Sequence, residues 1–266
     1  MSTALLAPEL LSSSDGPMLL AVTRQSGDVR MTERHHHERG QLLGADRGLL
    51  SVDAGGQRWV VPATHAVWVP PHVPHGARSH GPFAGWSVYV AAPSCAALPD
   101  RPFLLAMSGL LREAMTRAAA WRAGALDDAQ SRIAAVILDE IRAAPPAAQG
   151  LPMPTDARLL KIAHALSDRP EDSRGLDEWA AWAGLAPRTL SRRFVGETGF
   201  SFTEWRQRVR LQRALELLAA GRPVTAIALD LGYENVSAFI ALFRRVFGVT
   251  PGRYEALMRA VPAAGD

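Results

Sequence analysis

The last third of the sequence contains an internal repeat, and this repeat constrains the fold more than any other feature. The two copies are LDEWAAWAGLAPRTLSRRFVGETGFSFTEW (176–205) and VTAIALDLGYENVSAFIALFRRVFGVTPGRY (224–254). A short repeat with a glycine at one turn and matching apolar positions is typical of a duplicated structural unit. The matched pairs are Ala180 with Ala228, Gly184 with Gly232, Leu190 with Phe239, Phe194 with Phe243, Gly199 with Gly248, and Trp205 with Tyr254.

Each copy predicts two helices joined by a tight turn. Ala180 is small enough for two helices to cross at it, and Gly184 can adopt the left-handed conformation that ends the first helix. Pro187 suits the first turn of the second helix, in which Leu190 and Phe194 lie four residues apart on one buried face. The outward positions are Arg188, Ser191 and Arg192. The pattern predicts a helix-turn-helix whose outer face can enter the major groove of DNA.

The second copy also resembles a known family signature. The segment GYENVSAFIALFRRVFGVTPGRY (232–254) resembles the C-terminal motif of the AraC/XylS family of bacterial transcription regulators. The residues in register are Gly232, Tyr233, Ser237, Phe239, Phe243, Phe247, Gly248, Thr250, Pro251 and Tyr254. The resemblance covers residues 158–258 and implies two helix-turn-helix units joined by a central helix at about 202–220. It further implies recognition helices in successive major grooves, about 34 Å apart.

The resemblance implies DNA contacts from both recognition helices. The expected residues are Arg188, Thr189, Ser191, Arg192 and Arg193 in the first, and Ser237, Ala238, Ala241, Arg244 and Arg245 in the second. Ala241 stands where the family often has arginine. We therefore expect the first helix to make most hydrogen bonds to bases, and the second to contact thymine methyl groups and, through Arg244 and Arg245, phosphates.

A simpler alternative is that the arginines of this region are solvated helix surface. The set comprises Arg188, Arg192, Arg206, Arg208, Arg210 and Arg213. Only Glu197 and Glu204 stand among them, so the excess of positive charge favours nucleic acid. Binding to DNA should then weaken steeply with salt.

The N-terminal part of the sequence has the pattern of a β-sheet domain. Between residues 17 and 93, short apolar runs such as RWVVP, AVWVP and WSVYV alternate with turn residues, as in antiparallel sandwiches and barrels. The fold class is therefore α+β, with an N-terminal barrel, a helical hairpin, a linker and an all-α C-terminal domain. The expected boundaries are 1–107 for the β domain, 108–143 for the hairpin, 144–155 for the linker and 156–260 for the DNA-binding domain.

The hairpin carries a wide apolar stripe after the expected helix caps Asp127 and Asp128. Its residues are Ile133, Val136, Ile137, Leu138 and Ile141. Such a stripe can pack on its own barrel or on a second copy of the chain. We expect a homodimer formed through this segment.

Two segments of the β domain resemble the cupin motifs. The first has the spacing His35-x-His37-x3-Gln41-x6-Gly48, with glutamine where metal-binding cupins usually have glutamate. The second, VPPHVPH (69–75), has His72 in place of the usual glycine and His75 at the final ligand position. With SGLLREAM (108–115), these segments resemble the nitroimidazole-response subgroup of the AraC/XylS family. The resemblance implies a cupin jelly roll that senses an effector.

His35, His37, Gln41 and His75 form the expected effector or metal site. Three imidazoles and an amide oxygen could hold zinc, iron, nickel or copper, with an open position for water or effector. In the alternative, the same side chains hydrogen-bond an organic effector or pack beneath a loop. His65, His72 and His80 are expected to lie in loops or at the rim.

Three classes of function fit these features. The favoured one is a transcription regulator that binds double-stranded DNA as a homodimer, responds to a small-molecule effector and, as an activator, contacts RNA polymerase. A metal-dependent cupin enzyme such as a dioxygenase is the second, and the missing glutamate at position 41 counts against it. The third is a constitutive DNA-binding protein with a scaffold barrel.

The remaining composition indicates a cytoplasmic protein. The single cysteine, Cys95, excludes an internal disulfide and a cysteine-based zinc finger. No apolar run reaches the roughly 18 residues of a membrane span, and no basic segment precedes the first apolar residues. The formal net charge is only +3 and Lys161 is the only lysine, so arginine carries nearly all the positive charge. Arginine suits phosphate and guanine.

Overall fold

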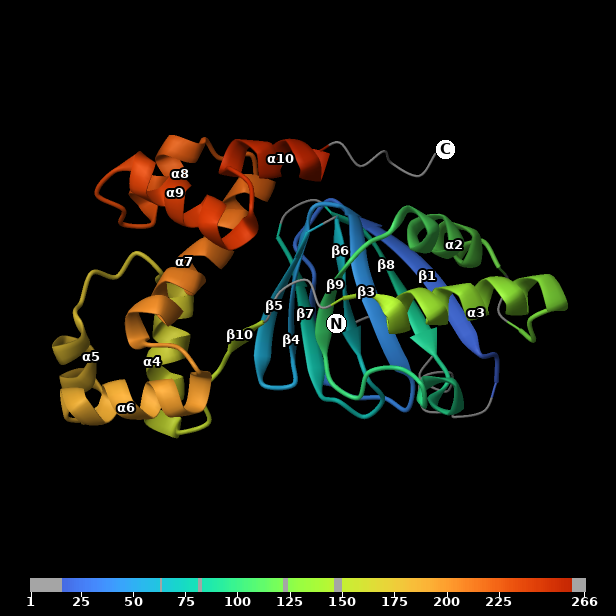
Figure 1. The fold of residues 1–266 in the computed structure, drawn as a ribbon, viewed down its shortest axis with the longest axis horizontal. Coiled ribbons are helices and arrows are strands. Elements are labelled where there is room, and N and C mark those ends of the chain that lie inside the picture. The colour runs from blue at the N-terminus through green and yellow to red at the C-terminus, as the bar shows by residue number, and fades with distance from the viewer. Residues whose placement is uncertain (1–15, 63, 81–82, 122–123, 146–149, 260–266) are drawn as a thin grey trace. The chain divides into compact units, whose positions relative to one another are not determined.

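The computed structural model describes residues 16–62, 64–80, 83–121, 124–145 and 150–259 (Figure 1). The chain divides into two compact units, one formed by the N-terminal part up to residue 150 apart from 56–58, and one by residues 56–58 and 151–257. Parts of all four expected domains lie outside the described residues, namely 1–15, 63 and 81–82 of the β domain, 122–123 of the hairpin, 146–149 of the linker and residue 260 of the DNA-binding domain. From Leu151 onward the expected linker belongs to the second unit.

The strands in the described part of the chain form two sheets with the orders β1-β8-β3-β6-β9 and β10-β5-β4-β7-β2, of which β10 belongs to the second unit. A hairpin between β4 and β5 turns at Gly55 and Gly56, whose φ angles of 58° and 71° favour glycine. The strands are β1 (Leu19–Ser26), β2 (Met31–His35), β3 (Gly40–Arg47), β4 (Leu49–Ala54), β5 (Gln57–Pro62), β6 (His65–Val69), β7 (His75–Ser79), β8 (Phe83–Val90), β9 (Phe103–Ala106) and β10 (Leu151–Pro152).

Alternation along the strands builds a core on each side of the first sheet. On β3, Leu43 points between the two sheets, where it packs in a cluster with Leu50 and Val52 of β4. Its neighbour Leu42 points the other way, into a cluster that also contains Trp68 of β6. The sheet is therefore buried on both faces, which explains why its strands are continuous apolar runs.

Two helices cover the outer face of this sheet (Figure 1). They are α2 (Gly109–Ala119) and α3 (Asp128–Ala143), preceded by a short 3-10 helix at Ala92–Cys95. Asp127 caps α3 as expected, since its side chain accepts from the backbone N–H of Gln130. Of the apolar stripe, Ile137 and Ile141 are fully buried against the barrel. The stripe therefore packs mainly on its own chain.

The second unit is helical, and α7 joins its two halves (Figure 1). Together the two units confirm the predicted α+β class. The predicted central helix, 202–220, agrees with α7 to within one residue. The helices are α4 (Ala157–Asp168), α5 (Leu176–Trp182), α6 (Pro187–Thr198), α7 (Phe202–Ala219), α8 (Val224–Asp230), α9 (Val236–Phe247) and α10 (Pro251–Arg259).

Each repeat folds as a helix, a turn and a helix. Gly184 and Gly232 occupy equivalent turns with φ angles of 65° and 74°. Ala180 is fully buried in one cluster with Phe194 and Trp205, so α5, α6 and α7 share a core. No helix in the described ranges combines the length and the apolar character needed to cross a membrane.

Candidate functional site

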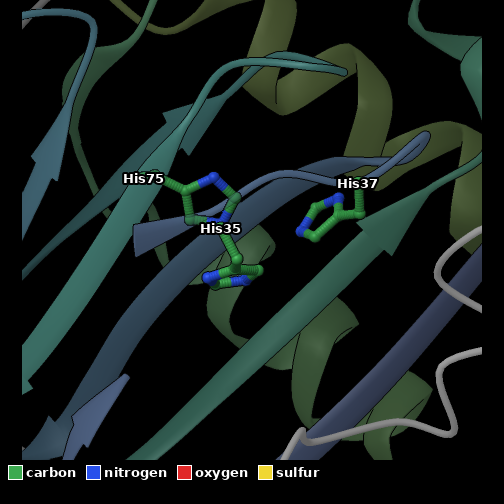
Figure 2. A group of neighbouring side chains, drawn as sticks. All are labelled: His35, His37 and His75. Carbon is green, nitrogen blue, oxygen red and sulfur yellow. The ribbon is translucent and has the colours of Figure 1, made fainter. Parts of the chain in front are cut away.

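Three histidines converge at one end of the β domain. His35 ends β2, His37 lies in the loop that follows, and His75 begins β7. Figure 2 shows the three rings turned toward one another, and their ligand atoms all lie within 4.8 Å. His75 and His37 are 2% and 7% exposed, whereas His35 is half-buried. This is the only such group of potential metal ligands among the residues that the structure describes.

The backbone fixes the tautomer of each ring. Nδ1 of His35, His37 and His75 donates to the carbonyl oxygens of Glu33, Arg39 and Val73 at 2.9, 2.7 and 2.8 Å, respectively. A carbonyl oxygen only accepts, so Nδ1 carries the proton and Nε2 keeps its lone pair in the neutral ring. Metal-binding histidines commonly have this second hydrogen bond.

Gln41 of β3 completes the group. Its Oε1 lies 2.9 Å from Nε2 of His75 and 3.2 Å from Nε2 of His37, and its Nε2 donates to the hydroxyl of Ser87 at 3.1 Å. Burial lowers the pKa of His37 and lowers that of His75 to about 4, so both rings are neutral. Three acceptor atoms therefore face one another without a proton between them.

Two arrangements remove this conflict. A cation among the acceptor atoms would be held by three imidazole nitrogens and one amide oxygen, a set that suits zinc, iron, nickel or copper. Alternatively, the amide of Gln41 is reversed, so that its NH₂ group donates to both rings and its oxygen accepts from Ser87. The donor atoms thus fit a transition metal, as the sequence predicted, and they also fit a polar wall for an organic ligand.

A cavity of about 390 Å³ lies beside this group, with His35, Gln41 and His75 in its wall. Its volume is within the range of about 300 to 1,000 Å³ that small-molecule sites occupy. Much of the remaining wall is apolar or aromatic and includes Leu43, Leu50, Phe83, Trp86 and Tyr89. The histidine group is therefore accessible to a small molecule from inside the barrel.

The remaining histidines of the β domain lie outside the group. His72 has a φ angle of 62° and a mostly exposed side chain 3.6 Å from Glu38. His80 bonds the hydroxyl of Ser51, and His65 bonds that of Thr64. His36 is exposed between two members of the group.

The first recognition helix, α6, exposes most of the residues predicted to contact DNA. Arg188, Ser191 and Arg192 are exposed, whereas Thr189 is half-buried. Arg193 is exposed but donates to Oδ2 of Asp156 at 2.8 Å. The pair joins α6 to the start of α4. Arg193 is thus engaged within the domain, while Arg188 and Arg192 have no ion pair among the described residues.

The second recognition helix, α9, presents a different surface. Ser237, Ala238 and Ala241 are exposed, and Arg244 and Arg245 follow in its last turn, also exposed. Among these exposed positions of α9, the basic residues come after the small ones. The expected division between apolar base contacts and phosphate contacts stays a prediction.

The arginines of α7 differ from those of the recognition helices. Arg206 donates to the backbone carbonyls of Asp172 and Arg174, and Arg210 donates to that of Pro170. Arg213 forms an ion pair with Glu216 at 2.7 Å. Their partners lie mainly in the loop before α5, up to 40 residues away. Arg206 and Arg210 thus join α7 to the loop before α5, and Arg213 pairs within α7, so fewer arginines are available to DNA than the sequence suggested.

Sequence reasoning also missed part of the cavity wall. Arg24, Ser87 and Tyr89 line it, but they belong to apolar or irregular stretches without a recognisable motif. The alternate positions of FAGWSVYV (83–90) could have suggested one shared face, although only the strand register brings Arg24 to that face.

Comparison with known proteins matches both units. A helix-turn-helix domain model matches residues 179–256, and a model of the AraC-like ligand binding domain matches residues 19–163. The HTH-type transcriptional regulator NimR of Escherichia coli K12 is 31% identical over 228 residues, which are 85% of this chain and 83% of NimR.

Other relatives match a smaller share of the chain. The HTH-type transcriptional regulator RipA of Corynebacterium glutamicum is 34% identical over 114 residues, which are 43% of this chain and 34% of RipA. A crystal structure of an AraC-type transcriptional regulator from Chromobacterium violaceum is 27% identical and covers 40% of this chain and 95% of that one, with a TM-score of 0.37.

Proposed function

This chain belongs to the AraC family of transcriptional regulators, and we propose that the occupant of its histidine site controls its binding to DNA. The family assignment makes it a sequence-specific DNA-binding regulator with a ligand-binding domain. The observation that carries the proposal is the common orientation of three rings, each fixed by a backbone carbonyl, toward one point.

The occupant that we propose is a divalent transition metal. His35, His37 and His75 would hold it through Nε2, with Oε1 of Gln41 as a further donor. The bound ion would supply an open coordination position for a donor atom of the effector. Uncharged ligands suit zinc, iron, nickel and copper better than magnesium or calcium.

We propose that the barrel senses a ligand and catalyses no reaction. The matched relatives are named as transcriptional regulators. Gln41 adds no negative charge to the histidine group, in contrast to the glutamate that the cupin resemblance leads one to expect. Steady-state turnover of a substrate by the iron-loaded protein would favour the enzyme alternative.

For the DNA complex, we propose that α6 reads bases through Arg188 and Arg192, with Thr189 and Ser191 beside them. In α9, Ser237, Ala238 and Ala241 would contact base edges and methyl groups, while Arg244 and Arg245 would contact phosphates. The exposure of these side chains, apart from the half-buried Thr189, supports this assignment. Arg193 would act by positioning α6, through its pair with Asp156.

The proposal also covers the oligomeric state of the protein, its contact with RNA polymerase and its location in the cell. We propose a homodimer that uses the outer surface of α2 and α3, where Leu110 is 58% exposed. A regulator of this family that acts as an activator would contact RNA polymerase. We also propose that it acts in the cytoplasm, where its proposed DNA target would lie.

A DNA-binding titration tests the proposal. Untagged protein is titrated with the region upstream of its own gene and with a scrambled control, each with and without a chelator. Specific binding that changes on chelation supports the metal. Specific binding that does not change on chelation contradicts the proposed metal, and it supports a regulator that responds to an organic effector instead.

A further inference from the structure

Arg24 points into the cavity from the edge of the first sheet. In the antiparallel register it lies opposite Gly85, which lies opposite Ala45. Directly opposed residues share a face of the sheet, and so do residues two positions apart. Arg24 is therefore on the face that carries Leu43 and Gln41, and it is one of the residues that line the cavity.

The guanidinium of Arg24 lies beside the cavity. Among the residues that the structure describes, no carboxylate or carbonyl oxygen pairs with it, although it is half-buried. Glu33 is the only acidic residue in the described cavity wall, which also includes the exposed Arg34 and Arg78. A half-buried arginine beside an apolar space favours an anionic guest, because pairing compensates the cost of removing its charge from water.

Apolar side chains line most of the space between Arg24 and the histidine group, with Ser87 as a polar exception. Arg24 pairs with Gly85 of β8, and Gln41 pairs with Tyr89 of the same strand. These positions are four residues apart, which is about 13 Å along an extended strand. Leu43 lies midway between Gln41 and the position paired with Gly85, and Leu50 packs in the same cluster. The ring of Phe83 lies over Gly85, since a Cβ atom built on Gly85 would come 1.9 Å from that ring.

We propose that the effector of this barrel is an organic anion with an apolar body, whose carboxylate or similar group is bound by Arg24. This inference rests on the proposed sensing function and names the chemical class of the ligand. The planar guanidinium can bind a carboxylate through two parallel hydrogen bonds. The apolar body would lie along Leu43 and Leu50, with its far end toward the histidine group.

The polar groups near Arg24 are compatible with an anion. Tyr89 also lines the cavity, and its hydroxyl can donate a hydrogen bond to an anion. An organic cation beside Arg24 would meet several arginines and one carboxylate in the wall, so we expect organic cations to be excluded from this part of the cavity.

Paired ligands test the charge requirement directly. Benzoate, phenylacetate and phenylbutanoate are each compared with the corresponding primary amide by isothermal titration calorimetry on chelator-treated protein. Removing metal beforehand separates recognition by arginine from ligation to an ion. We expect at least one carboxylate to bind about tenfold or more tightly than its amide.

Substitutions locate the anion site. Arg24→Gln should abolish the preference for the carboxylate, Arg24→Lys should retain part of it, and Arg47→Gln should leave it unchanged, because Arg47 is exposed on β3 and outside the cavity wall. Circular dichroism and thermal unfolding check that each variant folds.

Three results would overturn the inference. These are equal binding of acid and amide, a preference that survives in Arg24→Gln, and no binding of any acid in the series. Each of them leaves the DNA titration with and without chelator unaffected, so failure of the ligand class is distinct from failure of the proposed function.

Discussion

Nε2 of His75 lies 2.9 Å from Oε1 of Gln41, although neither atom carries a proton in the tautomer that the backbone imposes. Such a contact is stable when a cation lies between the acceptors or when the amide is reversed. Substitution of Gln41 distinguishes the two. Gln41→Glu should tighten metal binding by about tenfold or more, because an added negative charge near a divalent ion contributes several kcal/mol at an effective dielectric constant of about 20.

The affinity is measured by competition with a chromophoric chelator. Gln41→Leu is the matched control, because it removes the oxygen and should weaken binding. Equal affinity in all three proteins would show that position 41 does not contact the ion.

Metal content should depend on His35 and not on its neighbour. His35→Ala removes one of three converging ligands, whereas His36→Ala removes an exposed ring outside the group. Elemental analysis of untagged protein should give about one metal ion per chain for wild type and His36→Ala, and a large loss for His35→Ala. Absence of stoichiometric metal from the wild type would contradict the metal proposal.

Two adjacent arginines of α6 should behave differently. Arg192→Ala should cost about 1–3 kcal/mol at one base pair and relax the sequence preference there. Arg193→Ala should keep the preference and lower the thermal midpoint slightly, since Arg193 pairs with Asp156 within the domain. Binding to a library of single-base variants of the site measures both effects. Loss of sequence preference in Arg193→Ala alone would reverse these assignments.

The last turn of α9 should dominate the salt dependence of the second unit. Arg244→Ala and Arg245→Ala should weaken binding similarly for all sequences, and each should reduce the slope of log K against log salt by about one. The control Arg222→Ala removes an arginine that already pairs with Asp230 at 2.6 Å, so it should leave the slope unchanged. An unchanged slope in all three variants would show that Arg244 and Arg245 of α9 do not contact phosphates.

The proposed dimer has a direct test in solution. Light scattering at micromolar concentration should give the mass of two chains for the wild type. Leu110→Glu should shift the mass toward one chain, because the exposed side chain lies on the proposed surface of α2. Glu113→Lys, also on α2, changes a charge without removing an apolar side chain. It therefore tests whether a change of charge alone alters the measured mass. A monomeric wild type would rule out the dimer.

Local patterns explain what could be predicted from the sequence. The helix-turn-helix units depend on short-range features, such as Gly184 at a turn and Leu190 four residues before Phe194. The central helix was predicted within one residue for the same reason. In the β domain, His35, His37 and Gln41 lie within a few residues of one another, and the second motif added His75. The structure brings these four side chains together.

Long-range contacts explain what could not be predicted. Arg24 reaches the cavity only because β1 pairs with β8 in one register, and a shift of one residue would place it on the other face. Arg193 and Asp156 are 37 residues apart, and Arg210 and Pro170 are 40 apart. From sequence alone, the apolar stripe on α3 could pack on its own barrel or on a second chain. Ile137 and Ile141 are buried because of tertiary contacts that the local pattern does not specify.

The central claim is that the histidine group controls DNA binding, and a metal titration followed by DNA affinity tests it most directly. Untagged protein is stripped with a chelator, and zinc, iron, nickel or copper is added back while the anisotropy of a labelled specific DNA is recorded. We predict that DNA affinity changes until about one ion per chain has been added and then stays constant, and that His75→Ala shows no change. DNA affinity that stays constant from the stripped to the fully loaded protein would contradict the account.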